Sequence, residues 1–183
     1  MTAHDVLAFG NALVDILSHE DDDTIVRAGV ERGAMTLVDA VRADESYAAM
    51  SPTTEVSGGS AANTAAGIAS FGGRAAFVGR IADDTFGRVF THDLRSAGVH
   101  FDVPLADSGE PTGRCLVMVT PDAQRTLCTH LGAGADLDPT YVDEDLVADA
   151  AITYLEGYLW DQAPAKAAIR ARSEEHTAEL QSH

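Results

Sequence analysis

A pair of glycines followed by a run of small residues is the strongest local constraint on how this chain folds. Gly58 and Gly59 precede the segment 60–71, and Gly72 and Gly73 follow it. Glycine adopts backbone angles that are closed to other residues and lets a ligand approach the main chain. The alanine-rich segment predicts a helix, and glycines after it are typical of a helix C-terminus. The sequence therefore predicts a tight turn that leads directly into a helix.

The start of this predicted helix is a candidate binding surface. The first turn of a helix has free backbone N–H groups, which can donate to hydroxyl or anionic oxygens. Ser60 and Asn63 are one helical turn apart, so their side chains can face the same opening. Together with Gly58 and Gly59 they are predicted to form a polar pocket floor. The alternative is a capped structural helix with a tight entry turn.

The opening segment carries a carboxylate inside an apolar run. Residues 6–17 are mostly apolar, which predicts a strand covered on both faces, with Asn11 and Asp15 near its end. An isolated buried carboxylate is costly, and open α/β sheets bind ligands at the carboxyl ends of their strands. We therefore expect Asp15 to face a cavity and interpret it as a binding residue.

Strands and helices are predicted to alternate along much of the chain. The predicted strands are 35–38, 74–81 and 151–155, and the predicted helices are 39–50, 84–98 and 138–150. Segments 114–119 and 125–131 flank a Pro-Asp turn and predict an antiparallel hairpin. This order indicates an α/β fold with a largely parallel sheet and helices on its faces.

Charge and hydropathy exclude several classes of partner. Twenty-nine acidic and twelve basic residues give a formal net charge of −17, which opposes binding to nucleic acid or to an anionic membrane. No apolar run approaches the roughly 20 residues of a membrane span, and no secretion signal is evident. We expect a cytoplasmic protein with a small-molecule partner, and no metal site, because no ligand cluster has a recognisable spacing.

Cys115 and Cys128 lie on the two arms of the predicted hairpin. Two cysteines in such a chain fit a reducing compartment. A symmetric turn would place the thiols opposite each other, whereas a slip of one residue would separate them. We interpret both as small buried apolar residues. A redox pair is the alternative.

Taken together, the motifs resemble the N-terminal signature of a known family. The segments that carry the resemblance are 10–16, 58–63, 71–73, 78–80, 83–87, 98–99, 111–113 and 131–133. Their order and spacing resemble the ribokinase/PfkB family of sugar and nucleoside kinases. Segments 10–16, 60–63 and 154–160 are most similar to bacterial adenosine-kinase-like members. Ala82 is a small departure, since many members have glycine there.

The resemblance implies a ribokinase-like α/β/α sandwich with a small β lid, here truncated. The lid strands are expected from the segments between Ile16 and Ser57 and from the hairpin. The implied acceptor-binding residues are Asn11, Asp15, Gly58, Gly59, Ser60 and Asn63.

The implied reaction is ATP-dependent phosphorylation of a primary hydroxyl of a nucleoside or sugar, as in adenosine kinases. The full-length protein would use ATP and Mg²⁺, and lid strands would pair two subunits into a homodimer. The alternatives are a kinase for a free sugar such as ribose or fructose, and a non-catalytic sugar- or nucleoside-binding module. A dinucleotide-binding oxidoreductase is disfavoured, because no Gly-x-Gly-x-x-Gly turn follows the first strand.

The motifs of the family's catalytic centre are absent from the sequence. The family's base is an aspartate in a late Gly-Ala-Gly-Asp motif, whereas segment 132–136 reads Gly-Ala-Gly-Ala-Asp and follows the mid-chain hairpin, so Asp136 is not assigned as the base. The Asn-x-x-Glu element is absent as well. We therefore expect residues 1–171 to be the N-terminal part of one kinase domain, inactive alone, with the base in a missing C-terminal half.

Residues 172–183 lack the pattern of apolar residues seen in the rest of the chain, and we interpret them as a non-native, adapter-derived tail. The alternative is a natural polar C-terminal helix.

Overall fold

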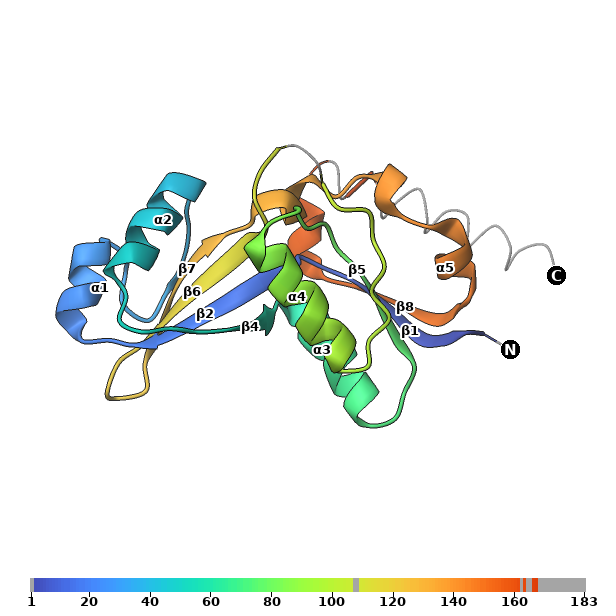
Figure 1. Cartoon of the computed structure of the whole chain (residues 1–183), viewed down its shortest axis with the longest axis horizontal. Coiled ribbons are helices and arrows are strands. Elements are labelled where there is room, and N and C mark those ends of the chain that lie inside the picture. The colour runs from blue at the N-terminus through green and yellow to red at the C-terminus, as the bar shows by residue number, and fades with distance from the viewer. Residues whose placement is uncertain (1, 107–108, 162, 164–165, 168–183) are drawn as a thin grey trace.

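The computed structural model describes residues 2–106, 109–161, 163 and 166–167, and contains two sheets, with α3 and α4 near the centre of the molecule (Figure 1). The segment 172–183, interpreted as a non-native tail, lies outside the described residues. No helix among the described residues is long and apolar enough to cross a membrane.

The first sheet is parallel and is covered by helices on both faces. Its strands are β5 (Ala75–Val78), β1 (His4–Phe9) and β8 (Ala150–Leu155), in that order. One face packs on α3 (Ser60–Ser70) and α4 (Thr85–Ser96), and the other on α5 (Glu144–Ala148) and on Leu137, which follows the 3₁₀ helix η1 (Gly132–Asp136). The central strand β1 is buried on both faces, because successive side chains contribute alternately to the two apolar clusters. The predicted α/β fold is confirmed.

The second sheet forms the lid and has mixed strand directions. Its order is β3 (Met35–Leu37), β7 (Arg125–His130), β6 (Gly113–Val119), β2 (Leu13–His19) and β4 (Thr54–Gly58). Two helices, α1 (Asp22–Ala28) and α2 (Ala40–Ala49), lie beside this sheet at the left of Figure 1. The segments expected to supply lid strands do so, and the hairpin is confirmed as β6 and β7.

Aspartates begin several of the helices. The side chains of Asp21, Asp39 and Asp84 accept hydrogen bonds of 2.7–2.8 Å from backbone N–H groups in the first turns of α1, α2 and α4. Such caps satisfy donors that the helix itself leaves free. The acidic cluster at residues 21–23 is therefore explained by the start of α1.

The opening apolar run is two strands, and the prediction of one strand over residues 6–17 is wrong. β1 ends at Phe9, and β2 begins at Leu13 in the other sheet. A side chain at Gly10 would collide with Ala61 and Glu156, so the chain passes between the sheets at a position that only glycine fits. Asp15 consequently lies on the lid strand β2, beyond the carboxyl end of the parallel strand.

The helix predicted over residues 138–150 is shorter than expected. Pro139–Tyr141 forms a 3₁₀ turn, η2, and α5 covers only Glu144–Ala148. Asp143 caps α5, so the helix starts anew there.

The register of the hairpin separates the two cysteines. Val119 pairs with Arg125, so that Cys115 lies opposite Thr129 and Cys128 opposite Leu116. Neighbouring residues of a strand point to opposite faces, so the two thiols lie on different sides of the sheet. Both are free and buried, as predicted, and the redox-pair alternative is excluded.

The strand predicted at 151–155 exists, but its predicted burial is wrong. It lies at the edge of the parallel sheet as part of β8, and residues 151–155 are all exposed. Ile152 is 61% exposed, whereas the neighbouring strand β1 contains Leu7 and Ala8 at 0%. No described strand pairs with the outer edge of β8.

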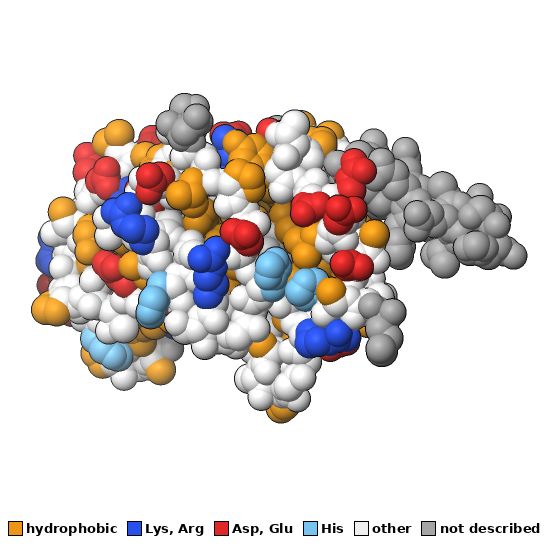
Figure 2. Space-filling model, turned by 45° about the vertical axis from the view of Figure 1, so that its right-hand side comes forward, with side chains coloured by type: hydrophobic (Ala, Val, Ile, Leu, Met, Phe, Trp, Pro, Cys, Tyr) orange, Lys and Arg blue, Asp and Glu red, His pale blue; other side chains and the backbone are white. Residues whose placement is uncertain are grey.

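Charged side chains of both signs are spread over the surface. On the face shown in Figure 2, lysine and arginine side chains occur singly or in small groups among acidic ones.

Candidate functional site

The predicted binding residues meet where the lid sheet joins the parallel sheet. β4 ends at Gly58, and α3 begins two residues later at Ser60. Gly59 has a φ of +95°, and a side chain there would collide with the carbonyl oxygen of Asn11. Glycine is therefore required at this turn for its conformation and for the close approach of two backbones.

Asp15 points at this turn. It pairs with Val56 of β4 and Cys115 of β6, and paired residues share one face of a sheet. A Cβ atom added to Gly58 would collide with the carboxyl group of Asp15. The absence of a side chain at Gly58 thus makes room for this carboxylate.

The carboxylate of Asp15 is unpaired within the described part of the chain. It makes no hydrogen bond or ion pair to any described residue, and burial raises its pKa above the ordinary value. The surrounding sheet face is largely apolar: Leu13, Leu17, Val56 and Val117 lie on it in register. A half-buried, unpaired carboxylate in such surroundings is a candidate ligand-binding group.

A neutral thiol lies beside Asp15. Burial is the main cause that raises the pKa of Cys115 to about 11, and the negative charge of Asp15 adds to it. The hydroxyl of Thr129 donates a hydrogen bond of 3.2 Å to the Cys115 sulfur. Cys115 therefore adds an uncharged wall next to the carboxylate.

A second carboxylate, Glu156, holds the start of α3 against the end of β1. It accepts a 2.6 Å hydrogen bond from the backbone N–H of Asn11 and another from the hydroxyl of Ser60. Glu156 is buried and lies just beyond β8. The Ser60 hydroxyl donates to the protein, so its contribution to the site includes fixing the helix start.

Sequence reasoning did not assign a role to Glu156, although a signal was present. It is a lone acid directly after the apolar strand 150–155, at the carboxyl end of a parallel strand. The argument applied to Asp15 fits Glu156 at least as well, because ligands and buried polar groups collect at this edge.

Asn11 is also buried, and it contacts Glu156 through its backbone N–H. Its side-chain oxygen has no hydrogen-bond partner, and its amide nitrogen is 3.5 Å from Glu156. Buried polar atoms nearly always have a hydrogen-bond partner. Because this oxygen has none among the described residues, it can accept a hydrogen bond from a ligand or water.

Asn63 is placed differently from the other predicted residues. It lies in the first turn of α3, where its backbone N–H donates to the Gly59 carbonyl at 2.9 Å. Its side chain is exposed and makes no hydrogen bond to a described residue. The structure thus brings together Asn11, Asp15, Gly58, Gly59 and Ser60. Asn63 lies in the same first turn of α3 as Ser60, with its side chain exposed to solvent.

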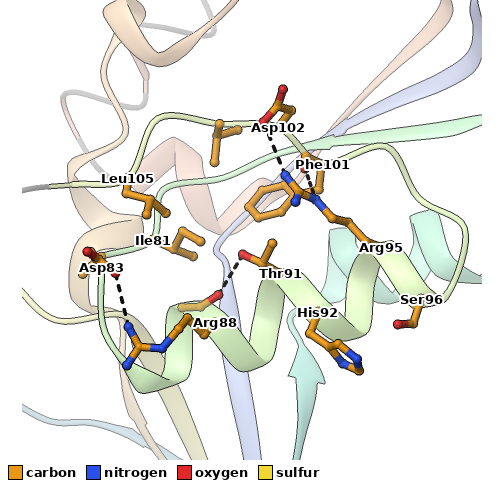
Figure 3. A pocket seen from close by; sticks show the side chains of 13 residues that line it. Ile81, Asp83, Arg88, Thr91, His92, Arg95, Ser96, Phe101, Asp102 and Leu105 are labelled. Carbon is orange, nitrogen blue, oxygen red and sulfur yellow. Dashed lines mark hydrogen bonds and ion pairs between the residues drawn. The ribbon is translucent and has the colours of Figure 1, made fainter.

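A separate hollow lies along α4. A groove of about 710 Å³ separates α4 from segment 101–105 (Figure 3). Arg88 and Arg95 mark its two ends, and each is paired, at 3.3 Å, with Asp83 and Asp102 respectively. Its charged groups are already neutralised and it contains none of the predicted residues, so we do not assign it to the acceptor.

No group of three or more His, Cys, Asp or Glu side chains among the described residues is arranged to hold a metal ion. Asp136 lies at the end of η1, where its carbonyl oxygen accepts a 2.9 Å hydrogen bond from Arg80. No chemical step through ATP or a metal is therefore derived from this chain.

Comparisons with known proteins agree with the fold and the motifs. The family model described as pfkB family carbohydrate kinase matches residues 19–179. Adenosine kinase from Sinorhizobium meliloti is 49% identical, with a TM-score of 0.88 over 96% of this chain and 54% of that one. A probable sugar kinase from Rhizobium etli CFN 42 is 47% identical, with a TM-score of 0.88 over 95% and 53%. A 5-dehydro-2-deoxygluconokinase from Geobacillus kaustophilus is 30% identical over 63% of this chain and 36% of its own length. The chain therefore spans about half the length of these solved structures.

Proposed function

This chain belongs to the pfkB family of carbohydrate kinases, and we propose that it forms the acceptor-binding part of an ATP-dependent kinase for a nucleoside or sugar. The reaction would transfer the γ-phosphoryl group of ATP to a primary hydroxyl. Adenosine is the first acceptor to test, because a relative named adenosine kinase is 49% identical. Free sugars follow, because a relative at 34% identity is named fructokinase.

The unpaired carboxylate of Asp15 carries this proposal. A carboxylate accepts hydrogen bonds only, and a pair of ligand hydroxyls supplies the donors that Asp15 lacks in the protein. Hydrogen bonds to a charged group are stronger than those between neutral groups. Asp15 would thereby fix the acceptor against the turn at Gly58 and Gly59.

The neighbouring groups would orient the acceptor further. The free backbone N–H groups at the start of α3 can donate hydrogen bonds to the acceptor, and the unpartnered side-chain oxygen of Asn11 can accept one from it. Glu156 holds Ser60 and Asn11 in place through hydrogen bonds. The exposed side chain of Asn63, in the first turn of α3, would contact the acceptor from the solvent side. Positioning of the reacting hydroxyl supplies much of the rate in phosphoryl transfer.

The phosphate side of the reaction is assigned to the part of the relatives that this chain does not match. ATP, bound with Mg²⁺, supplies the phosphoryl group, and the general base would lie in that part. By itself the chain is then expected to bind an acceptor and to transfer no phosphate. We place the protein in the cytoplasm, in agreement with its free thiols.

A lid-mediated homodimer belongs to the same proposal. Leu17, Met35, Leu37 and Val56 are exposed on the Asp15 face of the lid. Packing of two such faces would remove apolar surface from water. Light scattering on the purified chain, with Leu37→Glu as the disrupting variant, tests this association.

Calorimetric titration of the chain with adenosine, ribose and fructose tests the acceptor site. We expect binding of at least one of them, and a loss of roughly 10- to 100-fold in affinity for Asp15→Asn, because charged hydrogen bonds are lost. Asp23→Asn is the matched control, since it removes the same charge from an exposed position on α1. Equal binding by the Asp15 variant, or binding of no acceptor by the folded wild-type chain, would contradict the proposal.

A non-catalytic binding module is the second candidate, favoured by the presence of an acceptor floor without the motif for a base. The same titration applies to both functions. They are separated by assaying phosphate transfer after the part of a relative that this chain lacks has been added. Binding that persists without any transfer favours the module.

A further inference from the structure

Helix α4 lies near the centre of the molecule and contacts elements of both sheets (Figure 1). The side chain of Phe90 is fully buried, and its ring centroid lies 5.7 Å from that of Phe77 on β5 and 5.3 Å from that of Phe101. The same helix packs against the lid strands β2 and β4. Because aromatic packing anchors α4 beside the parallel sheet, the helix can hold the lid strands relative to that sheet.

Asp93, on α4, accepts a hydrogen bond from the edge of the lid. The backbone N–H of Ser57 donates to the Oδ2 atom of Asp93 at 3.1 Å. β4 is an edge strand of the lid, and every second N–H of such a strand points away from its sheet. Asp93 thus satisfies an outward donor of β4, one residue before Gly58, which faces the carboxyl group of Asp15.

A second aspartate makes the same kind of contact on the other side of β2. The backbone N–H of Thr112 donates at 2.8 Å to Asp84, whose other carboxylate oxygen caps α4. Thr112 directly precedes Gly113, the first residue of β6. Leu13, the first residue of β2, pairs with both Gly58 and Gly113. The two aspartates therefore hold both neighbours of β2 at the end of the lid that adjoins the parallel sheet.

We propose that α4 positions the acceptor-binding turn, and that Asp93 and Asp84 are the positioning residues through which it does so. The inference rests on the proposed acceptor site at Asp15. In the lid, Asp15 pairs with Val56 of β4 and Cys115 of β6, so a shift of either strand changes the space around its carboxylate. Each of the two aspartates acts through the backbone of a lid strand, and neither is assigned as a catalytic residue.

Helix capping alone does not account for these contacts. Capping of α4 uses one oxygen of Asp84 and leaves the hydrogen bond from Thr112 unexplained. Asp93 lies in the last turn of α4, where no helix N–H is free and where the helix dipole disfavours a negative charge. Its Oδ1 atom lies 3.1 Å from Nδ1 of His92, which is exposed. The hydrogen bond from Ser57 is therefore the contact that ties Asp93 to another element of the fold.

Calorimetric titration with adenosine, ribose and fructose tests the role of Asp93. We expect Asp93→Ala to bind the acceptor of the wild-type chain roughly tenfold more weakly, because the turn is no longer held. Asp93→Asn keeps an oxygen that can accept from Ser57 and should retain most of the affinity. Asp83→Ala is the matched control, since it removes an exposed carboxylate beside the same helix whose ion-pair partner, Arg88, is also exposed. Equal losses in the alanine and asparagine variants of Asp93 would contradict positioning through this hydrogen bond.

The role of Asp84 requires a variant that keeps the helix cap. Serine is a favourable N-cap residue, but its single side-chain oxygen cannot replace both carboxylate oxygens. Asp84→Ser should therefore retain α4, as measured by circular dichroism, and lose the hydrogen bond from Thr112. Acceptor affinity should fall roughly three- to tenfold. All titrations are made at a temperature at which each variant is folded, so a loss of affinity is separated from a loss of stability.

NMR of the free chain tests the positioning without any acceptor. In Asp93→Ala the Ser57 amide should exchange with solvent at least about tenfold faster, and the amide signal of Gly58 should shift. The pKa of Asp15 should fall toward its ordinary value, because its carboxylate becomes more accessible to water. Unchanged signals of Gly58 and Asp15 in both Asp93→Ala and Asp84→Ser would overturn the proposal. These signals are read whether or not an acceptor binds, so a failure of the positioning role is distinct from a failure of the acceptor site.

Discussion

Two carboxylates lie where the lid sheet joins the parallel sheet, and the described residues provide hydrogen-bond donors to only one of them. Glu156 is buried and accepts hydrogen bonds from Asn11 and Ser60, whereas Asp15 is half-buried and has no partner among the described residues. The first arrangement stabilises the junction of the strands and α3. The second reduces stability and leaves hydrogen-bonding capacity for a ligand. Binding and scaffolding are thus assigned to different acids within one small region.

Removal of Glu156 should give the largest loss of stability. Glu156→Ala leaves the Asn11 N–H and the Ser60 hydroxyl without their acceptor, which costs about 2–4 kcal/mol. A fall in melting temperature of roughly 5–15 °C should follow. Glu156→Gln retains one oxygen as acceptor and should lose less. If thermal melts of Glu156→Ala match the wild type, the scaffolding role is wrong.

A side chain at Gly58 should disturb the region around Asp15. Gly58→Ala places a methyl group against the Asp15 carboxyl, so we expect a loss of about 1–3 kcal/mol and weaker acceptor binding. Gly67→Ala is the matched control, because its methyl group would meet nothing within 4 Å in the middle of α3. That variant should gain about 0.5–1 kcal/mol. Similar urea denaturation curves for the two variants would contradict the packing described here.

The pH dependence of stability should reveal the buried, unpaired carboxylate of Asp15. Burial raises the pKa of Asp15, so the folded state holds this proton more tightly than the unfolded chain does. Its contribution to stability therefore falls as pH rises from the unfolded value of 3.8 through the raised folded value. Asp15→Asn should be more stable than the wild type at pH 7, and the difference should vanish near pH 3. Urea denaturation across this range measures it, and a variant that is less stable at pH 7 would show that Asp15 is paired after all.

The smallest expected effect concerns the thiol beside Asp15. With a pKa of about 11 and little exposure, Cys115 should react with a thiol reagent at pH 8 far more slowly than an unfolded cysteine does. Asp15→Asn removes one cause of the raised pKa and should increase the rate slightly. Fast labelling of Cys115 in the native chain would place it outside the buried wall of the site.

Local signals in the sequence predicted much of this structure. The glycine pair before α3 and the two arms of the hairpin depend on neighbouring residues, and the structure contains both. The break after Phe9 could not be located, because an apolar run looks the same whether it serves one sheet or two. The collision that requires glycine at Gly10 involves Glu156, which is distant in sequence.

Two features could not be predicted from the sequence because they depend on residues distant in the chain: the register of strand pairing and the burial of β8. Cys115 and Cys128 are separated by a single step in the pairing of β6 with β7, which no composition reveals. The apolar sequence of β8 predicted a buried strand, but residues 151–155 lie at the edge of the sheet and are exposed. The candidate site was predicted from single residues, while its hydrogen bonds required the fold.

Titration of the Asp15 carboxyl carbon by NMR, with and without adenosine or a sugar, shows whether this carboxylate is free to bind an acceptor. We expect a pKa above the ordinary value of 3.8 in the free chain, and a lower pKa once ligand hydroxyls donate to the charged form. A pKa at or below the ordinary value in the free chain, unchanged by adenosine or a sugar, would show that Asp15 is already satisfied and is not the acceptor-binding group.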